Sequence, residues 1–233
     1  MVKRIKQIVI GVVGGIGFFG CCMAIAVSQV APSSGDIDGY TGLHKAAHEG
    51  DVLTIRRLAS KGAELEARDR ARRTPLHVAA YASQDDAVRA LAEAGADMNA
   101  FEGQAYDIVT IAAVANDVKL LDLAIVLGTS PGNVTSPYDG TALIAAAHLG
   151  HFEIVKSLIA AGAPLDHVNN LGWTALIEVV VLGDGGANHV KTARALVDAG
   201  ADVDIADRDG STPLDHARAR GYTEMIAVLS ARR

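Results

Sequence analysis

A seven-residue pattern similar to Thr-Pro-Leu-His-x-Ala-Ala returns along this chain at a nearly constant interval. It is clearest from Thr74 to Ala80, and a close relative runs from Thr41 to Ala47, 33 residues earlier. Further copies begin at Thr141, Thr174 and Thr212. A period of this size indicates small structural units stacked in a row, each of which contacts its neighbours. This constraint on the fold is stronger than any other in the sequence.

A second marker fixes the register of the units. A Gly-Ala pair lies 21 residues after three of the pattern starts, at Gly62, Gly95 and Gly162. Thr at the start of the pattern is a good N-cap, and Pro after it suits the first helical position. Apolar residues at helical spacing precede the Gly, which suits the left-handed residue that ends a helix. The pattern therefore predicts where helices begin and end.

The motif and its period resemble the ankyrin repeat family over about residues 36–233. The resemblance implies an all-α repeat solenoid of six stacked repeats, each with two antiparallel helices and a projecting hairpin-like finger. An N-terminal hydrophobic segment at 1–31 and a linker at 32–37 precede the repeat domain at 38–233. The expected repeats are about 38–68, 69–100, 101–135, 136–168, 169–206 and 207–233. The leucines expected to point into the core are Leu43, Leu76, Leu143, Leu176 and Leu214.

Two repeats depart from the regular pattern. The third is disguised, because Asp107 stands 33 residues after Thr74 and replaces Thr as the N-cap. In the fifth, Gly200 falls 26 residues after Thr174, so five extra residues lie inside this repeat. We predict a lengthened loop at 182–189, which is either a tolerated surface insertion or a recognition element. Its candidate contact residues are Asp184, Asn188 and His189.

Composition and charge narrow the class of partner. A net charge of −6 argues against general nucleic-acid binding, which needs a basic footprint. The charges are nevertheless uneven, and they either keep the fingertips solvated or form patches that a partner contacts. The second finger carries a basic cluster of Arg68, Arg70, Arg72 and Arg73. The last finger carries an acidic cluster of Asp202, Asp204, Asp207 and Asp209.

The N-terminal segment has the form of an export signal. Lys3, Arg4 and Lys6 precede an uncharged run at 8–27, which predicts a cytoplasmic N-terminus and an exported repeat domain. The segment is a signal cleaved near Ala26, a retained membrane anchor, or a lipoprotein signal ending at Cys21. The absence of cysteine after Cys22 suits an exported domain. The expected location is the bacterial periplasm or the periplasmic face of the inner membrane.

The sequence holds no recognised catalytic or metal-binding motif. His44 and His77 occupy the His position of the motif, whose role in the resembled family is hydrogen bonding between neighbouring turns. His148 and His151 are three residues apart, but no Asp, Glu or Cys completes a set with metal-like spacing. Neither a Gly-x-Ser-x-Gly elbow nor a phosphate-binding loop occurs. We therefore expect no enzymatic activity, no cofactor and no metal.

Trp173 is the best single candidate for contact with a partner protein. It is the only Trp, stands directly before the N-cap Thr174, and lies at the base of a finger. Packing against the adjacent finger is the alternative. Further candidates on the same broad face are Tyr81, Arg72, Arg73, Tyr138, His148 and Glu178. We expect an exported scaffold, adaptor or inhibitor that binds another protein through its concave face and fingertips. The alternatives are a membrane-tethered spacer and an enzyme with an unrecognised site.

Overall fold

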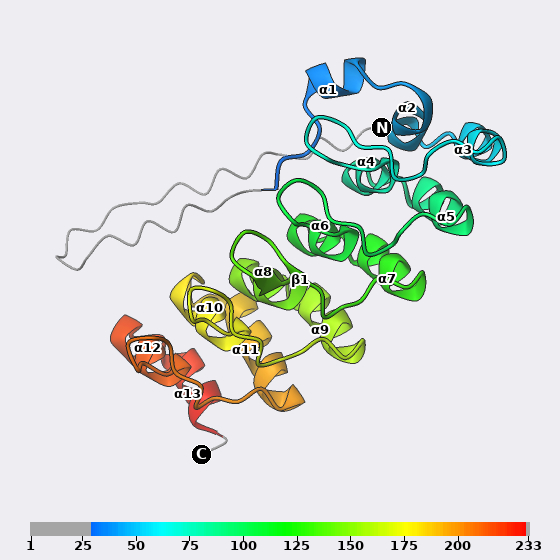
Figure 1. The fold of residues 1–233 in the computed structure, drawn as a ribbon. Coiled ribbons are helices and arrows are strands. Elements are labelled where there is room, and N and C mark those ends of the chain that lie inside the picture. The colour runs from blue at the N-terminus through cyan, green and yellow to red at the C-terminus, as the bar shows by residue number, and fades with distance from the viewer. Residues whose placement is uncertain (1–28, 232–233) are drawn as a thin grey trace.

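The computed structural model describes residues 29–231, which form thirteen helices and two short strands. Apart from a short helix α1 (Ser34–Asp38), the helices form six consecutive antiparallel pairs (Figure 1). The first helices are α2 (Gly42–Glu49), α4 (Pro75–Tyr81), α6 (Ile108–Ala115), α8 (Ala142–Leu149), α10 (Ala175–Val181) and α12 (Pro213–Arg220). The second helices are α3 (Val52–Ala59), α5 (Asp85–Glu93), α7 (Val118–Val126), α9 (Phe152–Ala160), α11 (Ala187–Ala199) and α13 (Thr223–Ser230).

The pairs stack in chain order into an elongated, curved array with two layers of helices (Figure 1). Each first helix packs on the first helix of the next pair, as α4 does on α6, and the second helices pack in the same way. The five predicted leucines are all buried, as are the alanine pairs that follow three of them, Leu43, Leu76 and Leu143. Small alanine side chains let the helices of adjacent pairs approach closely. The predicted all-α solenoid of six repeats is confirmed.

The predicted helix starts are also confirmed, because each marks the N-cap of a first helix. Asp107, the substitute in the disguised repeat, accepts a hydrogen bond of 2.8 Å from the backbone N–H of Thr110. At the other end of the unit, Gly95 has a φ of 97°, in the left-handed region that glycine adopts without steric strain. The six N-cap residues are Thr41, Thr74, Asp107, Thr141, Thr174 and Thr212.

A finger connects each second helix to the next first helix, at residues 61–73, 95–106, 128–140, 162–173 and 201–211. In the third finger, strands β1 (Val134–Thr135) and β2 (Gly140–Thr141) pair antiparallel. One polar side chain clamps each finger by accepting hydrogen bonds from the backbone N–H groups two and four residues later. Asp69, for example, accepts from Ala71 and Arg73 at 2.9 Å each. The clamp residues are Asp69, Glu102, Ser136, Asn169 and Asp207.

The N-terminal region differs from a simple linker. Within 32–37, helix α1 begins after Ser33, which forms a reciprocal capping box with Asp36. Residues 1–28, which hold most of the predicted signal or anchor, lie outside the described residues. Across residues 29–231, no helix is both long and apolar enough to cross a membrane.

The predicted loop at 182–189 is wrong in its second half. The connection ends at Gly186, the N-cap of α11, so Asn188 and His189 lie in the first turn of a helix. Helix α11 has 13 residues, against 8 or 9 in the other second helices. The insertion lengthens the helix because residues from Ala187 onward continue its hydrogen bonding and bury Val190 against the stack.

Candidate binding surface

The five fingers lie side by side along one side of the stack, and backbone hydrogen bonds join several of them directly. The N–H of Gly103 donates to the carbonyl of Ala71 at 2.9 Å, linking the first two fingers. The N–H of Ser136 donates to Ala105 at 3.0 Å, and that of Asn170 donates to Tyr138 at 2.9 Å. These bonds join the first four fingers, and the Arg208 side chain, which donates to the carbonyl of Asn170, joins the fifth to the fourth. We call the five fingers, restrained by these bonds and by the clamps, the finger row.

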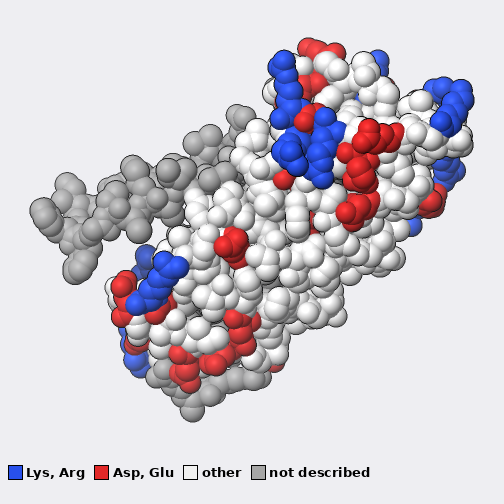
Figure 2. All heavy atoms as spheres, viewed as in Figure 1, with Lys and Arg blue, Asp and Glu red and all other residues white. Residues whose placement is uncertain are grey.

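The first finger of the row, at 61–73, carries the basic cluster that the sequence prediction assigned to a second finger. Arg68, Arg70 and Arg72 are exposed, and Figure 2 shows Lys and Arg gathered around this finger, near α4. The Arg68 guanidinium donates to the carbonyls of Arg72 at 2.8 Å and Phe101 at 2.6 Å, so it also bridges to the second finger. Arg72, predicted as a contact residue, is therefore on an accessible and ordered surface.

Arg73 does not belong to this basic surface, contrary to the sequence prediction. Its side chain is 1% exposed, and its guanidinium pairs with Asp69 at 2.7 Å and Asp36 at 3.0 Å. It also donates to the carbonyl of Val30 at 3.3 Å. The bonds from Ser33 and Arg73 hold the pKa of Asp36 near 2. Arg73 therefore fastens the N-terminal segment and α1 to the second repeat, and a partner cannot reach it.

The predicted aromatic contacts divide into buried and accessible residues. Tyr81 ends α4 and is buried, because the helices before and after it in the stack cover both sides of α4, so its prediction as a contact is wrong. Trp173 and Tyr138 are partly buried in their fingers. Two hydrogen bonds of 3.0 Å to Asn169 hold the backbone of Trp173. The Trp173 N–H donates to the Asn169 side chain, and the Asn169 N–H donates to the Trp173 carbonyl. Trp173 and Tyr138 remain candidates for contact.

Glu178 lies in α10 and is also buried rather than exposed, with 6% of its surface accessible. Its Oε1 accepts a hydrogen bond of 2.8 Å from the Asn169 side chain, and its Oε2 lies 3.6 Å from Nδ1 of His148. Burial raises the pKa of Glu178 to about 7. Burial also lowers the pKa of His148, and the nearby His189 and His151 add to this effect. The prediction that Glu178 contacts a partner directly is therefore wrong.

His189 was predicted as a loop contact and instead has a structural role. Its Nε2 donates to the carbonyl of His148 at 3.0 Å, and its Nδ1 lies 2.7 Å from the carboxylate of Asp184. His151 binds the carbonyl of Ala113 at 2.9 Å in the preceding repeat, so both histidines tie one repeat to the one before it. Asp184 and Asn188 are exposed beside this link.

The motif histidines make the contacts expected of them. His77 bridges the carbonyl of Ala100 at 3.1 Å and the N-cap Thr74, and His44 reaches the carbonyl of Arg73 at 3.0 Å. Burial lowers the pKa of His77 to about 4. Within residues 29–231 there is no group of three His, Cys, Asp or Glu side chains arranged to hold a metal ion.

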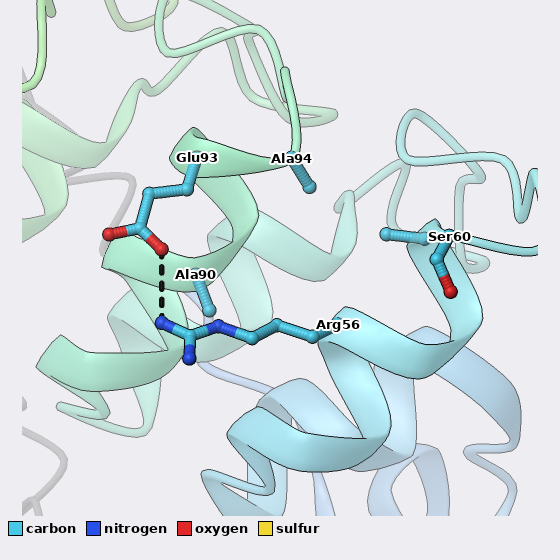
Figure 3. Close-up of a pocket in the computed structure, with 6 residues that line it drawn as sticks. Arg56, Ser60, Ala90, Glu93 and Ala94 are labelled. Atoms are coloured by element: carbon cyan, nitrogen blue, oxygen red, sulfur yellow. Dashed lines mark hydrogen bonds and ion pairs between the residues drawn. The ribbon is translucent and has the colours of Figure 1, made fainter.

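The opposite side of the stack has a shallow hollow of about 390 Å³ between α3 and α5 (Figure 3). Ala59, Ser60, Ala90 and Ala94 line it, and an exposed ion pair of 3.1 Å between Arg56 and Glu93 crosses it. This hollow is the gap that small side chains leave between neighbouring second helices. Its lining includes no nucleophile paired with a base, so it offers no arrangement for catalysis.

Three exposed apolar side chains in the finger row were not anticipated. Phe101, Val134 and Val168 lie in the second, third and fourth fingers and are 39%, 46% and 45% exposed. Each stands 27 residues after the N-cap of its own repeat, so the same register that located the core positions could have found them.

Models of known families match most of the chain. One described as ankyrin repeats (3 copies) matches residues 17–102 and 109–205, and another described as ankyrin repeats (many copies) matches 185–229. The chain belongs to the ankyrin repeat family. It is 33% identical to the putative ankyrin repeat protein YahD of Escherichia coli K12, over 80% of this chain and 92% of that protein.

Solved ankyrin structures share the same architecture. An ankyrin repeat domain from Acinetobacter baumannii AYE is 43% identical, with a TM-score of 0.76 over 80% of this chain and 95% of that one. The ankyrin repeat protein EF0377 is 29% identical, with a TM-score of 0.76 over 83% of this chain and 100% of that one. Ankyrin repeat domains are protein–protein interaction modules, and ankyrin homologues are generally non-catalytic.

Proposed function

We propose that this ankyrin protein is a non-catalytic module that holds another protein on its finger row, acting as an exported adaptor or inhibitor. The observation that supports this most directly is the rigidity of the row. Clamps inside the fingers and backbone bonds between them restrain the backbone from which the exposed side chains project before any partner arrives. A pre-organised surface loses little conformational entropy on binding, and this favours affinity.

Binding is tested by capture from periplasmic and membrane extracts with the wild-type chain and an Arg72→Ala/Trp173→Ala variant. We expect the variant to lose recovery of a partner that the wild type retains. Arg57→Ala/Val126→Ala is the matched control, because both side chains are exposed on second helices and neither belongs to a finger. Equal recovery by all three proteins would contradict a binding role for these two side chains.

The proposal of export rests on the N-terminal sequence, in which three basic residues precede the uncharged run at 8–27. The intact mass of the protein recovered from the periplasm tests it. Loss of about 26 residues supports a cleaved signal, and a full-length mass in the membrane fraction supports an anchored scaffold. Recovery of the whole chain from the cytoplasm would contradict export and leave the binding proposal standing.

An enzyme is the competing function, and its best support is the pair of Glu178 and His148. A carboxyl with a pKa of about 7 is suited to proton transfer near neutral pH. The carboxyl is, however, engaged by Asn169 and almost wholly buried, so a substrate would have little access to it. The finger row offers the larger accessible surface, and we favour binding for this reason.

A further inference from the structure

The exposed side chains of the finger row change in character from one finger to the next. The first finger is basic, through Arg68, Arg70 and Arg72. The next three each present one large exposed apolar side chain together with one exposed carboxylate, from Asp97, Asp139 and Asp166, and the last finger is acidic around the exposed Arg208. The exposed carboxylates of that last finger are Asp202, Asp204 and Asp209. In Figure 2, Lys and Arg gather beside a group of Asp and Glu at the end near α4, the middle is mostly uncharged, and the other end carries Asp and Glu with some Lys and Arg.

The three apolar side chains point outward for a local reason. Phe101 and Val168 directly precede the buried clamps Glu102 and Asn169, and Val134 precedes the buried Thr135. Successive side chains in an extended segment point to opposite sides, so each apolar side chain faces away from the helices. Of the large apolar side chains that are exposed within residues 29–231, these three belong to the finger row.

The spacing of the fingers suits one kind of ligand backbone. Packed helices lie about 8–10 Å apart, and the fingers follow the spacing of the helices they join. A polyproline-type segment has three residues per turn and rises about 3.1 Å per residue, so every third side chain returns to the same side about 9 Å further on. Such a segment can place one apolar side chain on each of three consecutive fingers.

We infer that the finger row binds an extended, polyproline-type segment of a partner protein, with apolar side chains at every third position and opposite charges at its two ends. The acidic end lies over Arg68, Arg70 and Arg72, and the basic end lies over the last finger. Charge complementarity sets which end of the segment lies on the first finger and which on the last, and the apolar contacts supply affinity. This inference rests on the proposed binding function and adds the chemistry of the partner.

Synthetic peptides test the inference directly on the full chain. The probes carry three acidic residues, three leucines at every third position with Pro between them, and three basic residues. One probe has its acidic end at the N-terminus and a second has it at the C-terminus, since the chain direction is open. A third has the same composition with its charges mixed. Binding is measured by fluorescence anisotropy at low and high salt.

The two probes with separate acidic and basic ends are called ordered probes. We expect one of them to bind at least about tenfold more tightly than the mixed probe, and this difference in affinity should shrink at high salt. The triple variant Phe101→Ser/Val134→Ser/Val168→Ser should bind that ordered probe about tenfold more weakly. The double variant Arg70→Glu/Arg72→Glu should bind the ordered and mixed probes with equal affinity. Leu53→Ser/Val126→Ser is the matched control, because both side chains are 80% exposed in second helices. Circular dichroism checks that each variant is folded.

The inference is overturned if no probe binds, if ordered and mixed probes bind equally, or if the finger variants bind as the wild type does. If no probe binds while the Arg72→Ala/Trp173→Ala variant still loses its captured partner, the binding function stands and the extended-segment partner is wrong. If neither probe binding nor capture depends on the row, both proposals fail.

Discussion

Two adjacent arginines show how a residue's role depends on what surrounds it. Arg72 and Arg73 have the same side chain and are adjacent in sequence, and the sequence predicts both as contacts. Arg72 takes a positive φ of 61° in the turn of the finger and is exposed. Arg73 turns inward and pairs with Asp69 and Asp36. A buried guanidinium with two carboxylate partners has a structural role, and an exposed one can take part in recognition.

Glu178 should give the protein a distinctive dependence on pH. Its pKa is about 7 when folded and about 4.5 when unfolded, so the folded state keeps a proton that the unfolded state releases between these values. The stabilisation is complete below about pH 4.5 and is lost as pH rises to about 7. Glu178→Gln should remove this loss, which amounts to about 3 kcal/mol.

Urea unfolding at pH 5 and pH 8 measures this difference, with the exposed Glu153→Gln as the matched control. The wild type and the control should lose stability relative to Glu178→Gln as the pH is raised. His148, whose pKa is lowered by burial, acts in the opposite direction and is common to all three proteins. Parallel pH profiles for all three would show that Glu178 ionises normally.

At the scale of elements, the helix pair and the finger depend on different residues. The pair is held by apolar side chains between neighbouring repeats, and the finger by one polar acceptor that binds two backbone N–H groups. The five clamp positions hold four residue types, Asp, Glu, Ser and Asn, because any acceptor of suitable length can fill the position. The residue five positions before the N-cap is therefore polar in every finger, and this regularity can be seen in the sequence.

Leu76→Ala tests the packing between pairs. Leu76 lies in α4 and is 1% exposed, so its truncation should leave a cavity between repeats and lower the free energy of unfolding by roughly 2–5 kcal/mol. Leu53→Ala makes the same chemical change at an exposed position in α3 and should alter stability by about 0.5 kcal/mol or less. Urea unfolding compares them. Similar values for the two variants would mean that Leu76 does not pack between repeats.

At the scale of the whole molecule, stability is the sum of contacts between neighbours. Helix α12 packs on α10 and its own partner α13, and α13 packs on α11, with no extensive contact to earlier helices in the described chain. Such an array behaves as a one-dimensional stack, in which terminal units contribute to stability without deciding the fold of the others.

A chain that ends before the sixth repeat, at about residue 206, should therefore stay folded but melt at a lower temperature. Its urea m-value should fall as well, because less surface is exposed on unfolding. Thermal melts and urea titrations followed by circular dichroism measure both quantities. Complete loss of helical signal at 25 °C would show instead that the last repeat is required for the stack to form.

The repeat register determined which side chains lie in the core and where helices begin. These features follow from local chemistry, since Thr or Asp caps a helix and regularly spaced apolar residues form one face. The register also located the insertion, but it did not reveal that the insertion extends α11. That outcome depends on contacts of Val190 and His189 with the preceding repeat.

Tertiary structure alone decided which candidate contacts are accessible. Tyr81, Arg73 and Glu178 are buried because neighbouring repeats and α1 cover them, and no property of their own segments shows this. In the same way, Phe101 and Val168 are exposed because the next residue is drawn inward as a clamp. The sequence by itself determined the architecture, since local patterns repeat in every unit. Which side chains are exposed depends on packing between units, because this packing brings together residues about one repeat apart in the sequence.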